Sequence, residues 1–210
     1  DCGLLGNVVA NCGFETGDHT SWTGSGATVD GSDGHAGSDA GNLSGAGSST
    51  LTQTISGTDA GKQYDLMVWI TTTTERDSFT AEVDNVVGTT QAFSISAQPF
   101  DDSIPYEVID VPFTATATAP AITFTDVASG SGGAYHVDDV SVTPSSCSDV
   151  PGNLVQNCGF ETGDTTDWTP TLSGSDAGVV STAHSGSDGF EFGDTDFDTL
   201  TQTLAGTHDG

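Results

Sequence analysis

Residues 7–23 read NVVANCGFETGDHTSWT, and residues 153–169 read NLVQNCGFETGDTTDWT. Thirteen of these seventeen positions are identical at a constant offset of 146. A second block recurs as TLTQTISGTDAG at 50–61 and TLTQTLAGTHDG at 199–210, where the offset is 149. The same kind of domain therefore begins twice. The first copy runs on to a strand-like segment, YHVDDVSVTP, whereas the second copy stops at Gly210.

The repeat predicts a complete domain over residues 1–146 and the first half of a second, homologous domain over residues 147–210. Half of a sandwich leaves an apolar face and an unpaired strand edge in water. Two expectations follow from this arrangement. Either the chain is a piece of a longer protein, or the half domain is completed by another molecule.

Alternation of apolar and polar residues predicts strands and no helices. One run places Tyr64, Leu66, Val68 and Ile70 on one face and Asp65, Met67 and Trp69 on the other. Period-two patterns of this kind are typical of half-buried strands, and Gly-, Asp- and Ser-rich clusters between such runs are typical of turns. The pattern indicates an all-β antiparallel sandwich. The Gly-rich stretch 24–49 is expected to be a long loop with one or two short strands.

The charge of the chain excludes two classes of partner. Thirty acidic residues face two basic ones, which gives a formal net charge of −28. Nucleic acid and anionic membranes are therefore excluded as electrostatic partners. Adaptation to a saline medium and specific cation binding both account for such a charge. No apolar stretch is long enough for a membrane span.

Four cysteines form two similarly spaced pairs. Nine residues separate Cys2 from Cys12, and ten separate Cys147 from Cys158. The duplicated spacing predicts a local disulfide in each copy, although a Cys2–Cys147 bond stays open as an alternative. Zinc is disfavoured because no histidine lies at ligand spacing near either pair. Disulfides, together with a chain that begins at Asp1, predict a processed, extracellular protein.

Three separate blocks carry a resemblance to a known group of domains. They are NxVxNCGFETGD…W, TLTQTI…GKQYDLMVW and FTATATAPAITFT…YHVDDVSVTP. These blocks resemble the carbohydrate-binding-module-like jelly rolls, the galactose-binding-like sandwiches of families four, nine and twenty-two in secreted bacterial proteins. The resemblance covers the whole first copy and the front of the second. It implies an antiparallel jelly-roll β-sandwich, but such domains serve as glycan binders, spacers and surface components, and fold does not fix function.

The resemblance also implies a structural Ca²⁺ ion. Its ligands are expected to be Glu15 and Asp138, with Asp139 as a neighbour and with backbone carbonyls of the 24–39 loop completing the shell. In the second copy, Glu161 matches Glu15.

Strand alternation adds an argument for Asp138. It places this carboxylate on the core side with Val140 and Val142, where a charged group needs a partner or a metal. The alternative is a carboxylate that accepts hydrogen bonds from backbone N–H groups of the loop.

Sugar recognition requires an exposed aromatic ring with polar neighbours. Trp69 points away from the apolar face of its strand, so it is the first candidate for stacking on a sugar, followed by Tyr106 and Asp65. The alternative is that Trp69 packs beneath a loop. The sequence contains no HExxH, G-x-S-x-G, phosphate-loop or CxxC motif, which favours a non-enzymatic protein.

Two functions fit these features. The favoured one is a structural subunit that forms an extracellular filament or sheath, in which a neighbouring copy completes the half domain. The alternative is a calcium-stabilised module that binds polysaccharide as part of a larger secreted enzyme or adhesin.

Overall fold

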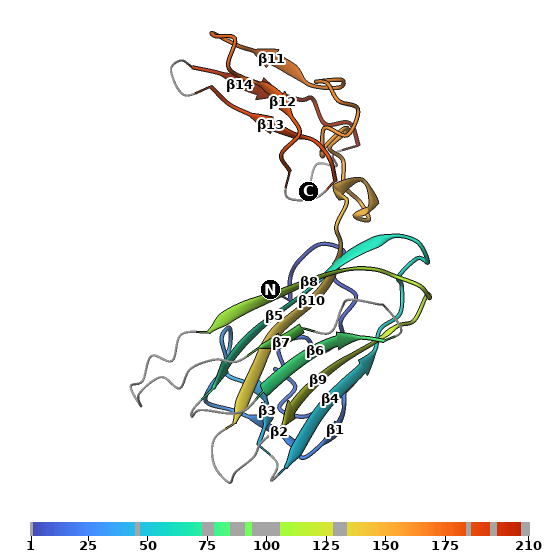
Figure 1. The fold of residues 1–210 in the computed structure, drawn as a ribbon, viewed down its shortest axis with the longest axis vertical. Coiled ribbons are helices and arrows are strands. Elements are labelled where there is room, and N and C mark those ends of the chain that lie inside the picture. The colour runs from blue at the N-terminus through green and yellow to red at the C-terminus, as the bar shows by residue number, and fades with distance from the viewer. Residues whose placement is uncertain are drawn as a thin grey trace. The chain divides into compact units, whose positions relative to one another are not determined.

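The computed structural model divides the chain into two compact units, Asp1–Thr143 and Pro144–Gly210. Figure 1 shows the strands of both units. The structure describes residues 2–44, 47–72, 78–84, 91–93, 106–127, 134–183, 186–193 and 197–206. The division falls near the boundary predicted after residue 146.

The first unit is a sandwich of two five-stranded sheets (Figure 1). One sheet has the order β1-β4-β9-β6-β7, and the other has the order β2-β3-β10-β5-β8. Every strand pair with a described register is antiparallel, so the predicted all-β jelly roll is confirmed. The strands are β1 (Thr23–Ser25), β2 (Ala27–Asp30), β3 (Ala40–Leu43), β4 (Ser48–Thr54), β5 (Gln63–Thr72), β6 (Ser78–Val83), β7 (Gln91–Phe93), β8 (Glu107–Thr114), β9 (Ala121–Val127) and β10 (Tyr135–Pro144).

Apolar side chains from both sheets meet in one core. The alternation predicted for β5 is confirmed, because its apolar set is buried while its intervening residues are half-buried. Phe79 of β6 and Phe124 of β9 contribute from the other sheet and stack at 5.9 Å between ring centroids. Burial of such aromatic and branched side chains contributes about 1.5–3 kcal/mol each and is the main force that holds the sheets together.

The stretch 24–49 contains more strand than its sequence predicts. Three short strands, β1, β2 and β3, lie within it, and β4 begins at Ser48. The expectation of one or two short strands was wrong because strands of three or four residues show too little alternation. They form by pairing: β1 pairs with β4, β3 pairs with β10, and β2 pairs with β3.

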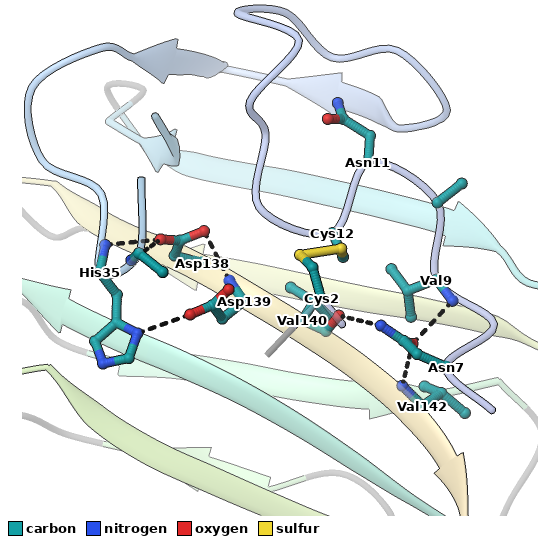
Figure 2. Close-up of a disulfide and its surroundings, with 12 residues drawn as sticks. Cys2, Asn7, Val9, Asn11, Cys12, His35, Asp138, Asp139, Val140 and Val142 are labelled. Atoms are coloured by element: carbon teal, nitrogen blue, oxygen red, sulfur yellow. Dashed lines mark hydrogen bonds and ion pairs between the residues drawn. A yellow bond between two sulfur atoms is a disulfide. The ribbon is translucent and has the colours of Figure 1, made fainter. Parts of the chain in front are cut away.

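The N-terminal segment is fastened along β10. Val8 N–H donates to the Val142 carbonyl at 3.1 Å, and Val140 N–H donates to the Cys12 carbonyl at 2.9 Å. Figure 2 shows Asn7 between Val9 and Val142, whose N–H groups both donate to its side-chain oxygen. These bonds bring the opening block of the sequence next to the last strand of the unit.

The second unit contains two separate strand pairs. β11 (Thr169–Thr171) pairs with β14 (Thr199–Thr201), and β12 (Gly178–Val180) pairs with β13 (Gly189–Glu191). These pairs match β1–β4 and β2–β3 of the first unit in order. In the part of 144–210 that the structure describes, no residue is buried.

The opening segments of the two units make the same contacts. Trp22 Nε1 donates to the Asn11 carbonyl, and Trp168 Nε1 donates to the Asn157 carbonyl, both at 3.1 Å. Phe14 then stacks on Trp22, as Phe160 does on Trp168. The repeated sequence therefore folds locally in the same way, with or without a sheet to cover it.

Among the residues that the structure describes, little helix is present. One short 3₁₀ helix, η1 (Cys147–Asp149), follows β10. Among the residues described, no helix has the length and apolar character needed to cross a membrane.

Candidate functional site

The candidate site lies on the outer face of the β2-β3-β10-β5-β8 sheet. On β5, Trp69 is half-buried on the face opposite the core. Its cross-strand partner on β8 is Val108, which is 42% exposed. Met67 and Asp65, which are two and four residues before Trp69 on β5, lie on the same face. The face therefore offers the indole ring of Trp69 and the carboxylate of Asp65 along β5. The exposed side chain of Val108 lies beside the ring on β8.

A loop between β2 and β3 reaches over this face and covers one side of Trp69. The His35 ring stacks on the Trp69 ring with 4.1 Å between centroids and an interplanar angle of 12°. Tyr106 meets His35 edge-on at 5.1 Å. The loop therefore covers one face of the Trp69 ring, as the alternative stated from the sequence expects.

Tyr106 is anchored to the same loop. Its hydroxyl donates to the Asp33 carbonyl oxygen. Burial, followed by the nearby Asp138 carboxylate, raises the pKa of Tyr106 well above its ordinary value. The hydroxyl therefore stays protonated and acts as a donor, which fixes the position of the ring.

Two neighbouring carboxylates on β10 hold His35 in place (Figure 2). Asp138 Oδ2 accepts hydrogen bonds from the backbone N–H groups of His35 at 2.7 Å and Ala36 at 3.1 Å. Asp139 Oδ2 lies 2.8 Å from His35 Nδ1, so this ring nitrogen carries a proton and donates it. Backbone and ring of His35 are each tied to β10.

The structure corrects the predicted orientation of Asp138. Simple alternation placed it on the core side with Val140 and Val142, but Val137 and Val140 both belong to the core. The pattern breaks at Asp139, whose φ of 47° is left-handed. This kink turns Asp138 toward the β2–β3 loop, although it stays fully buried. Burial raises its pKa to about 6, while N–H donors, Ala36 first, lower it.

Glu15 binds the end of the same loop. Its Oε1 accepts hydrogen bonds from Ser38 N–H at 3.0 Å and Asp39 N–H at 2.9 Å. Gly37 has a φ of 82° and lies so close to the Glu15 carboxylate that a side chain has no room there. Backbone N–H groups thus satisfy this carboxylate.

The second unit repeats the Glu15 contacts. Glu161 Oε1 accepts from Ser187 N–H at 3.0 Å and Asp188 N–H at 3.1 Å. The equivalent glycine is Gly186, with a φ of 76°. Glu15 and Glu161 therefore play the same local role, that of an acceptor for a turn.

Of the predicted calcium ligands, Glu15 and Asp138 both accept hydrogen bonds from backbone N–H groups of the β2–β3 loop. The donors in these contacts are N–H groups, however, and Ca²⁺ is bound by oxygen atoms. These contacts correspond to the alternative in which loop N–H groups satisfy the carboxylates, and the calcium site stays a prediction.

Both local disulfides are present in the structure. Cys2–Cys12 and Cys147–Cys158 have Cα–Cα distances of 5.5 Å and 6.1 Å. Figure 2 shows the first of these beside Val140. No described cysteine is free, so the alternative Cys2–Cys147 pairing is not formed.

Sequence reasoning missed His35 as part of the site. The one sequence feature that marks His35 is the repeat, in which it aligns with His184 at the offset of 149. That alignment indicated a loop role and gave no indication that the ring lies on Trp69. The partner depends on the path of the loop, which the strand pattern does not encode.

Comparison with known proteins finds likeness in structure alone. Neither a protein-family model nor a curated protein matches the sequence. A family 61 carbohydrate-binding module, TmCBM61, in complex with β-1,4-galactotriose, is 22% identical, with a TM-score of 0.51. That match covers 66% of this chain and 98% of that module.

Two further solved structures have a similar fold. A family 16 carbohydrate-binding module is 14% identical over 65% of this chain and 99% of its own, with a TM-score of 0.52. The arabinose-bound α-L-arabinofuranosidase MgGH51 is 13% identical over 79% of this chain and 30% of its own, with a TM-score of 0.50. The chain thus has the jelly-roll fold of carbohydrate-binding modules.

Proposed function

We propose that the first unit is a non-catalytic, extracellular module that binds polysaccharide on the outer face of β5 and β8. The observation that carries this proposal is the position of Trp69 on that face, beside an exposed Val108 and within a cluster of aromatic rings. The likeness to carbohydrate-binding modules supports it. The two disulfides are consistent with an extracellular setting.

The chemistry of the face suits a sugar chain. An indole ring packs against the apolar C–H face of a pyranose, and a nearby carboxylate accepts hydrogen bonds from its hydroxyl groups. Trp69 supplies the ring, and Asp65, four residues earlier on the same face of β5, supplies the carboxylate. Tyr106 supports the cluster from the side through its contact with His35.

The charge narrows the class of polysaccharide. A protein with a formal net charge of −28 repels sulfated and uronate-rich chains. We infer a neutral polysaccharide. β-1,4-Galactan is the first ligand to test because the similar family 61 module is bound to β-1,4-galactotriose.

The test is retention of the full chain by a panel of neutral polysaccharides in affinity electrophoresis. We expect Trp69→Ala to weaken binding about tenfold or more, which corresponds to roughly 1.4 kcal/mol. Leu5→Ala is the control, because this apolar side chain is 63% exposed and lies in the N-terminal segment, away from β5 and β8 in the sequence. Equal retention of the wild type and Trp69→Ala contradicts the proposal, provided both have the same circular dichroism spectrum.

Calcium is a separate proposal that rests on the resemblance and on the binding of one loop by both Glu15 and Asp138. When bound, the ion supplies a link between the opening segment and β10. Thermal melting before and after exhaustive chelation tests it. We expect chelation to lower the Tm of the wild type and to leave Asp138→Asn unchanged. An identical Tm of the wild type in both conditions contradicts it.

Self-association is a second candidate function, favoured by the exposed apolar side chains of the second unit. They are Leu154 (37%), Leu172 (39%), Leu204 (42%), Phe192 (54%) and Phe197 (95%). In the first unit, the matching pairs β1–β4 and β2–β3 are extended into five-stranded sheets by β9 and β10 and their neighbours. The proposed occupant is a second copy of the chain, and repeated contacts of this kind build a filament.

Light scattering of the full chain tests this second candidate. We expect a mass above that of the 21.2 kDa monomer, and we expect Phe192→Ser with Phe197→Ser to reduce it. A monomeric wild type at high salt, where charge repulsion is screened, contradicts the self-association.

A further inference from the structure

A group of metal-ligating side chains lies at the edge of the candidate face. Asp30 ends β2, Asp33 follows in the loop, and His136 lies on β10. One ligand atom from each lies within 4.8 Å of the others. Among the residues that the structure describes, this is the one group of three or more His, Cys, Asp or Glu side chains so placed. None of the three belongs to the calcium set predicted from the sequence.

The sheet brings these residues together from distant parts of the sequence. β3 pairs with β2 on one side and with β10 on the other. Asn42 of β3 is the direct cross-strand partner of His136. Asp30, the last residue of β2, pairs with Ala40, two residues before Asn42 on β3, and Asp33 follows in the loop with its Oδ2 3.8 Å from His136 Nε2.

His136 is buried and lacks a partner for one of its nitrogen atoms. Its side chain is 2% exposed. Nε2 lies 3.8 Å from Asp33 Oδ2 and 3.1 Å from Asn42 Nδ2. Neither His136 Nδ1 nor Asn42 Oδ1 has a hydrogen-bond partner. The contact between these two side chains is made by Nδ2 and Nε2, and the two unpaired atoms are the other polar atoms of the same groups.

A cation bound among these groups would take Nε2 of His136, the nitrogen that faces Asp33. Rotation of the Asn42 amide exchanges its nitrogen and oxygen, which brings Oδ1 to the side that faces His136 Nε2. The amide oxygen then lies next to the group formed by Asp30, Asp33 and His136, whose ligand atoms lie within 4.8 Å of one another. A tetrahedral ion with bonds of about 2.0–2.2 Å holds its ligand atoms roughly 3.4 Å apart. The 3.8 Å between Nε2 and Asp33 Oδ2 is near this spacing.

We propose that Asp30, Asp33 and His136, assisted by Asn42, bind a divalent transition-metal ion of the Zn²⁺ class. An imidazole ligand favours Zn²⁺ over Ca²⁺ and Mg²⁺, which take oxygen ligands. Two carboxylates neutralise the charge of the ion. The side chain of Asp33 is 41% exposed, which gives the ion a path of entry from solvent.

The experiment is calorimetric titration of ZnCl₂ into the metal-stripped full chain, in a large excess of Ca²⁺. The excess fills the many surface carboxylates that bind cations weakly. We expect one Zn²⁺ per chain, with affinity reduced more than about tenfold in Asp33→Asn and Asp30→Asn. Asp84→Asn, an exposed carboxylate after β6 on the other sheet, is the matched control and keeps the wild-type affinity.

A second readout identifies the histidine without a mutation in the core. We expect Zn²⁺ to shift the imidazole ¹⁵N resonances of His136 before those of the other four histidines. The proposal is overturned if Ca²⁺ abolishes Zn²⁺ binding, if Asp33→Asn binds as the wild type does, or if a different histidine alone responds.

Discussion

Asp18 lies in a tight turn that the sequence encodes twice. Its Oδ1 accepts hydrogen bonds from Thr16 Oγ1 at 3.0 Å and Thr20 N–H at 2.8 Å. Asp164 accepts the same pair of bonds from Thr162 and Thr166, both at 2.9 Å. These bonds favour the ionised carboxylate, so the pKa of each aspartate lies below its ordinary value of 3.8.

Because this turn occurs in both units, a substitution in one copy can be compared with the unchanged copy in the same molecule. The side chain of Thr20 is the largest cause of the lowered pKa of Asp18. We expect Thr20→Val to raise the Asp18 pKa toward 3.8 and to leave Asp164 unchanged, as measured by carboxyl ¹³C NMR. Since the folded-state pKa is lowered, the turn stabilises the fold above 3.8, and this contribution disappears as pH falls through the folded value. An unmoved Asp18 resonance contradicts the assignment.

In β10, the alternation of apolar and polar residues predicted the position of some side chains and failed for Asp138. Alternation predicted the burial of Val140 and Val142 correctly, yet it assigned the wrong face to Asp138. The left-handed backbone at Asp139 causes the error. A single residue in this conformation shifts the pattern by one position, and Asp is one of the few residue types that tolerate it. Composition alone does not show where such a shift occurs.

At the scale of elements, β3 depends on one glycine. A side chain on Gly41 would meet Phe14 Cζ at 2.7 Å, Leu51 Cδ1 at 2.9 Å and Val137 Cγ2 at 2.9 Å. We expect Gly41→Ala to destabilise the first unit by about 1–3 kcal/mol, the usual cost of overpacking a filled core. Denaturant unfolding measures the change.

The control for this prediction is Gly3→Ala. Nothing lies within 4 Å of a side chain at Gly3, so we expect its midpoint to match that of the wild type. Equal midpoints for all three proteins contradict the packing described around β3.

The long strands were predictable from sequence, whereas the short ones and their loop were not. β5 and β10 carry enough residues for alternation to appear, and burial follows it along β5. The strands β1, β2 and β3 have three or four residues each, and their pairing partners are decided by the sheet. For this reason Trp69 was predictable as an outward-facing ring, but the His35 ring that covers it was not.

At the scale of the whole molecule, the two units differ in what they bury. The first unit has a continuous core drawn from both sheets. The second has two strand pairs, and among its described residues none is buried. Two-stranded sheets are at best marginally stable in water, because most of the stabilising free energy comes from burial.

We therefore expect residues 1–143 and 144–210, prepared separately, to melt differently. The first fragment should unfold in one cooperative transition, and the second should show no cooperative transition at low concentration, as measured by calorimetry. The disulfide Cys147–Cys158 lies within the second fragment and should be kept oxidised in this comparison. A sharp transition in the isolated second fragment contradicts this account.

The His35 side chain, which stacks on Trp69, competes with a sugar ligand for one face of the indole ring. An aromatic side chain already lies where a sugar ring would stack on one face of the indole, so a ligand there must first displace it. The affinity measured for such a ligand is then the affinity of the uncovered ring multiplied by the fraction of molecules in which His35 has moved away. We expect His35→Ala to bind polysaccharide more tightly than the wild type in the same electrophoresis assay. A weaker His35→Ala variant would instead make the imidazole a direct contact of the sugar.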